Sequence, residues 1–127
     1  MSESDFISAI VHEADCLLHL DVNNIYVNSR NFGFDPLTFM DPLPFERTCY
    51  AHVAGHFVEP DGLLIDTHGA EVIDPVWALL EAAYARISGE VPSCLERDFN
   101  IPDLSALTAE VEQIARFQAA AGQRKAA

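Results

Sequence analysis

The chain has 127 residues, half of them hydrophobic, which allows one packed domain and excludes a chain that is disordered throughout, because disorder requires low hydrophobicity. Seven basic residues against 20 acidic ones give a net charge of -13, which argues against nucleic acid and an anionic membrane surface as partners, since both attract basic proteins. The sequence contains no run of about 18 apolar residues that would span a membrane, and its acidic N-terminus is unlike a signal peptide, so we expect a cytoplasmic protein.

The first third of the chain predicts a helix, a strand and a long connection. The helix covers Ser2 to Ala14, with Ser2 as its N-cap and Asp5 three residues later as the partner in a capping box. Cys16 to Asp21 is a short apolar run that ends in an acid, which is typical of a buried parallel strand. Val22 to Arg47 is polar and interrupted by proline and glycine. We expect a connection without regular structure there, and connections of this length are often functional.

The middle of the chain predicts a second strand and a second helix. The strand covers Thr48 to His52, and a further short apolar run, Gly62 to Ile65, precedes a polar segment. Asp74 and Pro75 then begin the helix as its N-cap and first-turn proline, and Gly89 ends it.

The last part of the chain predicts a third strand, Val91 to Glu96, and a helix that begins at Asp103, followed by a frayed tail over residues 122–127. Helices and strands in this alternation predict a parallel α/β fold. Three strands buried on both faces would expose apolar edges in a small open sheet. Residues 1–121 therefore fit better as the C-terminal portion of a (β/α)8 barrel, namely its last three strands and their helices, with the open sheet as the alternative.

The three cysteines are predicted to be reduced and buried. Cys16, Cys49 and Cys94 show no CxxC spacing, and each lies in an apolar run. An odd number of cysteines without an export signal favours free thiols, and free cysteine is among the most buried residue types. His19, in the middle of the first strand, is likewise expected to pack against its neighbours.

Each predicted strand ends in a residue that can bind metal: Asp21, His52 and Glu96. The carboxyl ends of the strands form the catalytic face of an α/β barrel, so we expect these side chains to meet at one place. Asn24 lies three residues beyond Asp21, on the connection that leaves the first strand. Taken singly, an acid at a strand end is usually a cap or a turn residue, and the prediction depends on the joint placement.

Asp66 and His68 form a second candidate pair. They flank one residue, so in an extended segment both side chains point the same way and can bind one ion. Carboxylate, imidazole and amide oxygen together suit iron, manganese or zinc. Other polar residues near these positions could line the pocket or contact substrate, or could serve only in caps and loop hydrogen bonds: His56, Asn23, Tyr26, Asn28, Asp98 and Asn100.

Four segments carry a pattern that resembles a known enzyme family: Leu20–Asn28 (LDVNNIYVN), His52–His56 (HVAGH), Leu64–Gly69 (LIDTHG) and Leu95–Pro102 (LERDFNIP). In this order they resemble the MbnB/TglH family of multinuclear non-heme iron enzymes, whose fold is a xylose-isomerase-like TIM barrel. The resemblance extends from the first helix to the last. It implies two or three iron ions in the complete barrel, with six ligands in this chain: Asp21, Asn24, His52, Asp66, His68 and Glu96.

The resemblance also implies a function. Members of the family oxidatively modify cysteines of a ribosomally made precursor peptide, usually with a partner protein that presents the substrate. A barrel of this kind has about 250 residues, and its earlier strands supply further metal ligands. We therefore expect this chain to be the C-terminal fragment of such an oxidase, which lacks part of the site and needs the N-terminal barrel half.

Two other functions remain open at this point. The chain could be a non-catalytic remnant from a truncated reading frame. It could also serve another metal-dependent TIM-barrel reaction, such as isomerisation or hydrolysis, with zinc or manganese in place of iron.

Overall fold

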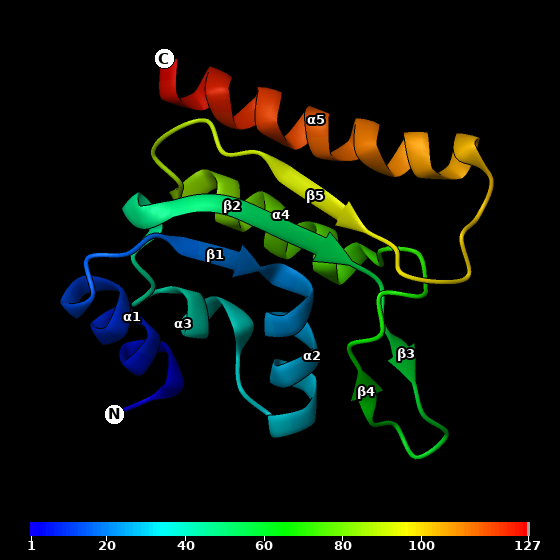
Figure 1. Ribbon diagram of the computed structural model, residues 1–127, viewed down its shortest axis with the longest axis horizontal. Helices are drawn as coiled ribbons and strands as arrows, with labels where there is room; N and C mark the ends of the chain where they lie inside the picture. Colours follow the sequence, from blue (N-terminus) through cyan, green and yellow to red (C-terminus); the bar gives the residue numbers. More distant parts are fainter. Residues whose placement is uncertain (127) are drawn as a thin grey trace.

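A parallel sheet of three strands runs through the middle of the computed structural model, which describes residues 1–126 (Figure 1). The strands are β1 (Leu18–Asp21), β2 (Thr48–Ala54) and β5 (Ser93–Glu96), and they lie side by side in chain order. The register places Asp21 beside His52. The predicted mixed α/β fold with a parallel sheet is thus confirmed, and all three strands end at the same edge of the sheet.

The segment between β1 and β2 is helical, so the prediction of an irregular connection was wrong. It forms α2 (Val22–Phe32), α3 (Pro36–Met40) and a short 3-10 helix, η1 (Phe45–Arg47). Asp21 caps α2 by accepting a hydrogen bond of 2.8 Å from a backbone N–H in its first turn. Gly33 ends α2 in the left-handed conformation, with φ 71°. Both signals are visible in the sequence, but the many asparagines between them have low helix propensity.

Two other helices agree with the sequence. α1 (Glu3–Glu13) is capped by Ser2, and the reciprocal bonds between Ser2 and Asp5 form the predicted capping box. α4 (Asp74–Arg86) has Pro75 in its first turn as expected and ends three residues before Gly89. The prediction of Asp74 as its N-cap was wrong, because Ile73 occupies that position and makes no side-chain cap hydrogen bond.

The last helix, α5 (Leu104–Ala126), is longer than predicted. Asp103 caps it, because its Oδ1 accepts a hydrogen bond of 2.9 Å from the backbone N–H of Ala106. Residues 122–126 are helical where a frayed tail was expected, and Ala127 lies outside the described residues. Within residues 1–126 no helix combines the length and the apolar character needed to cross a membrane.

A small hairpin leaves the carboxyl end of β2. It pairs β3 (Phe57–Val58) with β4 (Leu64–Ile65) in antiparallel fashion, and the sequence had indicated only a short apolar run here. The side chain of Asn31 in α2 donates a hydrogen bond of 2.8 Å to the carbonyl of Leu64 and accepts one of 2.9 Å from the backbone N–H of the same residue. These two bonds fix β4 beside the last turn of α2.

Only one face of the sheet is buried. Leu20, Ala51 and Val53 turn toward the helices and form the core with Leu80 of α4. The other face carries mostly polar side chains that are exposed or half-buried, with the fully buried Ala54 at the end of β2 as an exception, which corrects the expectation of strands buried on both faces. His19 is exposed on this face, and its ring packs edge-on against that of His52 with centroids 4.1 Å apart.

The cysteines also differ from the prediction. Cys16 and Cys49 are exposed and Cys94 is half-buried, although all three are free thiols as expected. Apolar neighbours in the sequence did not imply burial here, because Cys16 precedes β1 and Cys94 lies on the open face of the sheet, beside His52.

The helices follow the order of the strands. α2 contacts β2 and α4, α4 contacts α5, and α5 contacts β5, so that α4 lies behind the sheet and α5 runs along its β5 edge (Figure 1). Parallel strands in chain order with helices packed side by side are consistent with part of the wall of a (β/α)8 barrel.

Candidate metal centre

Three donor side chains meet where the strands of the sheet end. His52 Nδ1 lies 2.9 Å from Glu96 Oε2 and 3.8 Å from Asp21 Oδ2. These three residues come from β2, β5 and β1, so neighbouring strands bring together positions that are 31 to 75 residues apart in the chain. The sequence predicted this convergence from the strand ends, and the structure brings the three side chains together, although β2 continues for two residues beyond His52 to Ala54.

Asp66 and His68 join the same cluster. His68 Nε2 lies 3.0 Å from Asp66 Oδ1, and His68 Nδ1 lies 3.4 Å from Glu96 Oε2. The backbone is not extended here as predicted, because His68 adopts a left-handed conformation with φ 54°. Its carbonyl accepts a hydrogen bond of 3.0 Å from the backbone N–H of Asp98, which holds the bend. Strained backbone of this kind is common at functional sites.

The donors form three overlapping groups within the described part of the chain. Each group offers ligand atoms within 4.8 Å of one another, and the groups share members. Asp21 and Glu96 each belong to two of them, as does His68. Shared carboxylates allow neighbouring ions to be bridged, so the arrangement suits more than one ion. The three groups are Asp21 with His52 and Glu96, Asp21 with Asp66 and His68, and His68 with Glu96 and Asp98.

The spacing of the donor atoms fits a bound metal ion. Two atoms that each lie about 2.1 Å from one ion are about 3.0 Å apart at a right angle and about 3.4 Å apart at the tetrahedral angle. The closest pairs, His52 with Glu96 and His68 with Asp66 or Glu96, have separations of 2.9, 3.0 and 3.4 Å. His68 Nε2 is also buried and has no hydrogen-bond partner within residues 1–126, although Asp66 is so near. A nitrogen and an oxygen that lie this close without a hydrogen bond between them are expected when both face the same cation.

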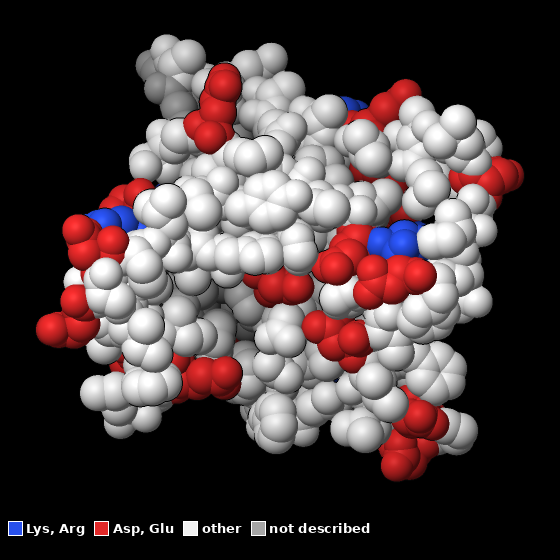
Figure 2. All heavy atoms as spheres, viewed as in Figure 1, with Lys and Arg blue, Asp and Glu red and all other residues white. Residues whose placement is uncertain are grey.

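The electrostatics of the cluster also favour a cation. Burial raises the pKa of Asp21, and the Asp66 carboxylate adds to this effect, against the hydrogen bond from the Asn24 backbone. Burial by itself lowers the pKa of His68, but the charges of Asp66, Glu96 and Asp21 outweigh it and the pKa of His68 is raised. Figure 2 shows acidic side chains gathered around the ends of the three strands. A metal ion would neutralise this concentration of negative charge.

Asn24, the sixth predicted ligand, lies beside the cluster with its amide nitrogen toward it. Its Nδ2 is 3.2 Å from Asp66 Oδ2, and its Oδ1 accepts a hydrogen bond of 3.1 Å from Asn28 Nδ2. The predicted amide-oxygen ligand is therefore turned away from the other donors. Rotation of the amide by half a turn would present the oxygen, at the expense of both hydrogen bonds.

The predicted pocket residues lie at different places relative to the cluster. Asp98 Oδ2 lies 3.3 Å from His68 Nδ1, at the rim of the cluster. Asn100 donates to the carbonyl of Gly69 over 3.1 Å and serves a turn, because its backbone is also left-handed.

Asn23 and His56 are buried behind Asp66 and are joined by a hydrogen bond. The Tyr26 ring lies 5.3 Å from that of His56, centroid to centroid. These side chains therefore support the cluster from the protein side.

Two aromatic neighbours of the cluster were not predicted as site residues. His19 and Tyr50 flank His52 on the open face of the sheet, with ring centroids 4.1 and 5.4 Å from the His52 ring. The period of two along a strand was the available signal, since each lies two residues before a predicted donor. Their packing restricts the orientation of His52.

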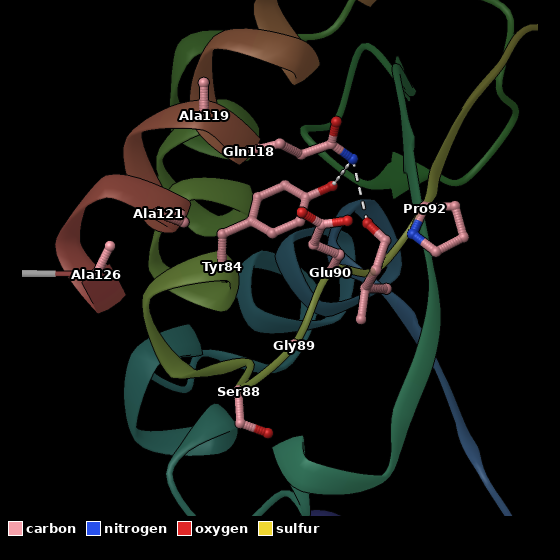
Figure 3. Close-up of a pocket in the computed structure, with 11 residues that line it drawn as sticks. Tyr84, Ser88, Gly89, Glu90, Pro92, Gln118, Ala119, Ala121 and Ala126 are labelled. Atoms are coloured by element: carbon pink, nitrogen blue, oxygen red, sulfur yellow. Dashed lines mark hydrogen bonds between the residues drawn. The ribbon is translucent and has the colours of Figure 1, made fainter.

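A cavity of about 860 Å³ lies at the other end of the sheet, between the C-terminal parts of α4 and α5 (Figure 3). Gln118 Nε2 donates to Tyr84 Oη over 2.9 Å and to the carbonyl of Val91 over 3.1 Å. Tyr84 Oη also bonds to the hydroxyl of Ser93. The polar groups of Tyr84 and Gln118 are thus bonded within the cavity wall, and the cavity is lined by none of the donors described above.

The comparisons with known proteins agree on one family. The family described as "RiPP precursor modification enzyme MbnB/TglH/ChrH" matches residues 1–119. A UPF0276 protein of Alcanivorax borkumensis is 58% identical over 118 residues, which are 93% of this chain and 39% of the relative. UPF0276 proteins of Nitrosospira multiformis (58% over 119 residues, 94% and 42%) and Neisseria meningitidis serogroup B (54% over 124 residues, 97% and 44%) are similar. The chain spans about two fifths of the length of these curated relatives.

Proposed function

The chain belongs to the MbnB/TglH/ChrH family of RiPP precursor modification enzymes, and from this membership we propose that it supplies part of the metal centre of a multinuclear iron oxidase. The substrate is a cysteine-containing, ribosomally made peptide. In this proposal the chain forms the last three strands of a (β/α)8 barrel, and an N-terminal barrel half contributes the remaining ligands. A partner protein presents the peptide.

The observation that carries the proposal is the convergence of five acidic and histidine side chains from four separate segments, with overlapping donor groups within 4.8 Å. Asp21, His52, Asp66, His68 and Glu96 would hold the metal. Oxygen and nitrogen donors without thiolate suit iron, and the open end of the sheet leaves room for substrate. Iron bound there would supply redox chemistry with dioxygen and lower the pKa of a substrate thiol.

The residues of this chain would prepare the site for that chemistry. Asp21 serves both as the cap of α2 and as a donor, so the helix fixes its carboxylate. Glu96 Oε2 lies between His52 and His68, at 2.9 and 3.4 Å, and can neutralise charge on both sides. The acidic surface favours a neutral or basic peptide over an acidic one, because like charges repel.

The proposal is tested by the metal content per chain after anaerobic expression with iron, measured on a monodisperse size-exclusion peak. We expect near-stoichiometric iron in the wild type and its loss in Asp66→Ala and His68→Ala. Glu112→Ala, which removes an exposed carboxylate of α5 outside the cluster, is the matched control and should retain iron.

Other outcomes separate the alternatives. A folded chain that takes up zinc or manganese in preference to iron favours a metal-dependent isomerase or hydrolase. A folded chain without metal contradicts a centre assembled by these residues alone. The oxidative step is tested in the full-length Alcanivorax borkumensis relative, by the mass change of cysteine-containing peptides incubated with the iron-loaded protein and dioxygen.

A further inference from the structure

A chain of hydrogen bonds runs behind the metal-binding cluster. Asn23, in the first turn of α2, has a fully buried side chain. Its Nδ2 donates to Asp66 Oδ1, and its Oδ1 lies 2.9 Å from His56 Nδ1. His56 is 8% exposed and follows β2. Three segments that are distant in the sequence are therefore connected through one buried amide.

The orientation of this amide follows from the chemistry of its partners. An ionised carboxylate accepts hydrogen bonds and cannot donate them, so the nitrogen of Asn23 faces Asp66. The oxygen of the same amide then faces His56. Because an oxygen can only accept, His56 Nδ1 carries a proton. Asp66 thus specifies the orientation of Asn23, and Asn23 specifies the tautomer of His56.

The backbone keeps the partners together. Gly55, directly before His56, approaches the carbonyl oxygens of Ala70 and Glu71 so closely that a Cβ at this position would collide with both. This contact joins the end of β2 to the segment that follows Asp66 and His68.

The second oxygen of the Asp66 carboxylate is also held. Asn24 Nδ2 lies 3.2 Å from Asp66 Oδ2. Neighbouring asparagines of α2 thus bind opposite oxygens of one carboxylate. They differ in burial, since Asn23 is fully buried and Asn24 is exposed. Only the buried member keeps its hydrogen bonds away from competing water, so the fixed orientation of Asp66 depends mainly on Asn23.

We propose that Asn23 is a positioning residue that holds Asp66 in its metal-binding orientation, and that His56, as the Nδ1–H tautomer, locks the Asn23 amide in place. This inference rests on the proposed metal centre. Partners that orient a ligand in this way typically change metal affinity by about 10–100-fold when they are removed.

The first test needs no metal. Long-range ¹H–¹⁵N NMR spectra of the metal-free chain report which ring nitrogen of each histidine carries the proton. We expect His56 as the Nδ1–H tautomer in the wild type, and a shift toward Nε2–H in Asn23→Ala. A wild-type His56 in the Nε2–H form would overturn the proposal.

The second test is a cobalt(II) titration of the folded chain, followed by the visible absorption of the bound ion. Asn23→Ala and His56→Leu should each weaken binding by about 10–100-fold. His56→Asn should restore binding, because its amide nitrogen can donate from the place of Nδ1. Ser29→Ala is the matched control. The Ser29 hydroxyl is buried in the same helix but donates to the carbonyl of Tyr26, outside the chain of hydrogen bonds from Asp66 to His56.

The outcomes distinguish this inference from the proposed function. A wild type that binds no cobalt(II) contradicts the metal centre and the positioning role together. If Asn23→Ala and Ser29→Ala lose the same small amount of cobalt(II) affinity, the metal centre stands and the positioning role alone is overturned. If Asn23→Ala fails to fold, His56→Leu and His56→Asn decide the question. Equal cobalt(II) affinities of these two variants would contradict the role of His56 in holding the Asn23 amide.

Discussion

Removal of Arg97 is expected to destabilise the protein far more than removal of an exposed arginine. Arg97 directly follows Glu96, and its Nη2 lies 2.8 Å from Glu110 Oε2 of α5. The two side chains are only 8% and 15% exposed. The other oxygen of Glu110 accepts a hydrogen bond of 2.7 Å from the backbone N–H of Val72. This buried ion pair joins the end of β5, where a donor of the cluster lies, to the last helix.

The size of the effect follows from burial. Arg97→Met leaves the Glu110 carboxylate buried without its cation, and breaking a buried pair in this way costs about 3–5 kcal/mol. For a chain of this size each kcal/mol corresponds to a shift in melting temperature of about 3–5 °C, so we expect a fall of about 10–25 °C. The double variant Arg97→Met/Glu110→Gln should lose at least about 1 kcal/mol less than the sum of the two single variants.

The control is Arg47→Met. Arg47 Nη1 lies 2.7 Å from Asp15 Oδ1, a shorter contact than that of Arg97, but the side chains are 34% and 82% exposed. Water and salt screen such a pair, so its loss should cost less than about 1 kcal/mol. Urea denaturation and thermal melts followed by circular dichroism measure all four variants. Equal losses for Arg97→Met and Arg47→Met would refute the reasoning, because the expected difference rests on the burial of the Arg97–Glu110 pair.

Three further predictions follow from particular contacts. Gly55→Ala should prevent stable folding, since its Cβ would meet the carbonyl oxygens of Ala70 and Glu71; soluble yield and melting temperature test this, and a melting temperature equal to that of the wild type would contradict the close approach. Burial lowers the pKa of His56 below its ordinary value, so the unfolded chain binds the proton first and stability should fall as the pH drops below about 6.5, by at most about 1.4 kcal/mol per pH unit; urea denaturation across this range should show a smaller loss in His56→Asn. Asp21→Asn keeps the helix cap but removes a carboxylate whose charged form is disfavoured by burial, which raises its pKa. The substitution should raise the melting temperature of the metal-free chain and weaken cobalt(II) binding. Unchanged cobalt(II) binding would exclude Asp21 as a ligand.

Much of the fold was accessible from local patterns. The parallel strands and the helix over residues 74–86 follow from apolar runs, caps and alternation, which depend on neighbours in the chain. α2 was missed because its asparagine-rich sequence resembles a polar connection, although Asp21 and Gly33 mark both of its ends. The β3–β4 hairpin was missed because each strand has two residues, too few for a period of two to appear.

The candidate site divides in the same way. The residue types and their places at strand ends predicted Asp21, His52 and Glu96, because carboxyl ends of parallel strands must meet at one edge of a sheet. The sequence could not show that His68 needs a left-handed backbone to reach Asp66. That bend depends on a hydrogen bond from the segment after β5, which is a contact between distant parts of the chain.

Burial was decided by the tertiary structure. Cys16 lies in an apolar run of the sequence but is exposed, whereas Asn23, one of two adjacent asparagines, is fully buried. Nothing in the residue types distinguishes Asn23 from Asn24. The difference arises because α2 packs against β2 and α4, which turns one amide toward His56 and leaves the other at the surface. Local sequence selects helices, strands and donor types, but only the packing of distant segments determines which polar side chain is enclosed and what it touches.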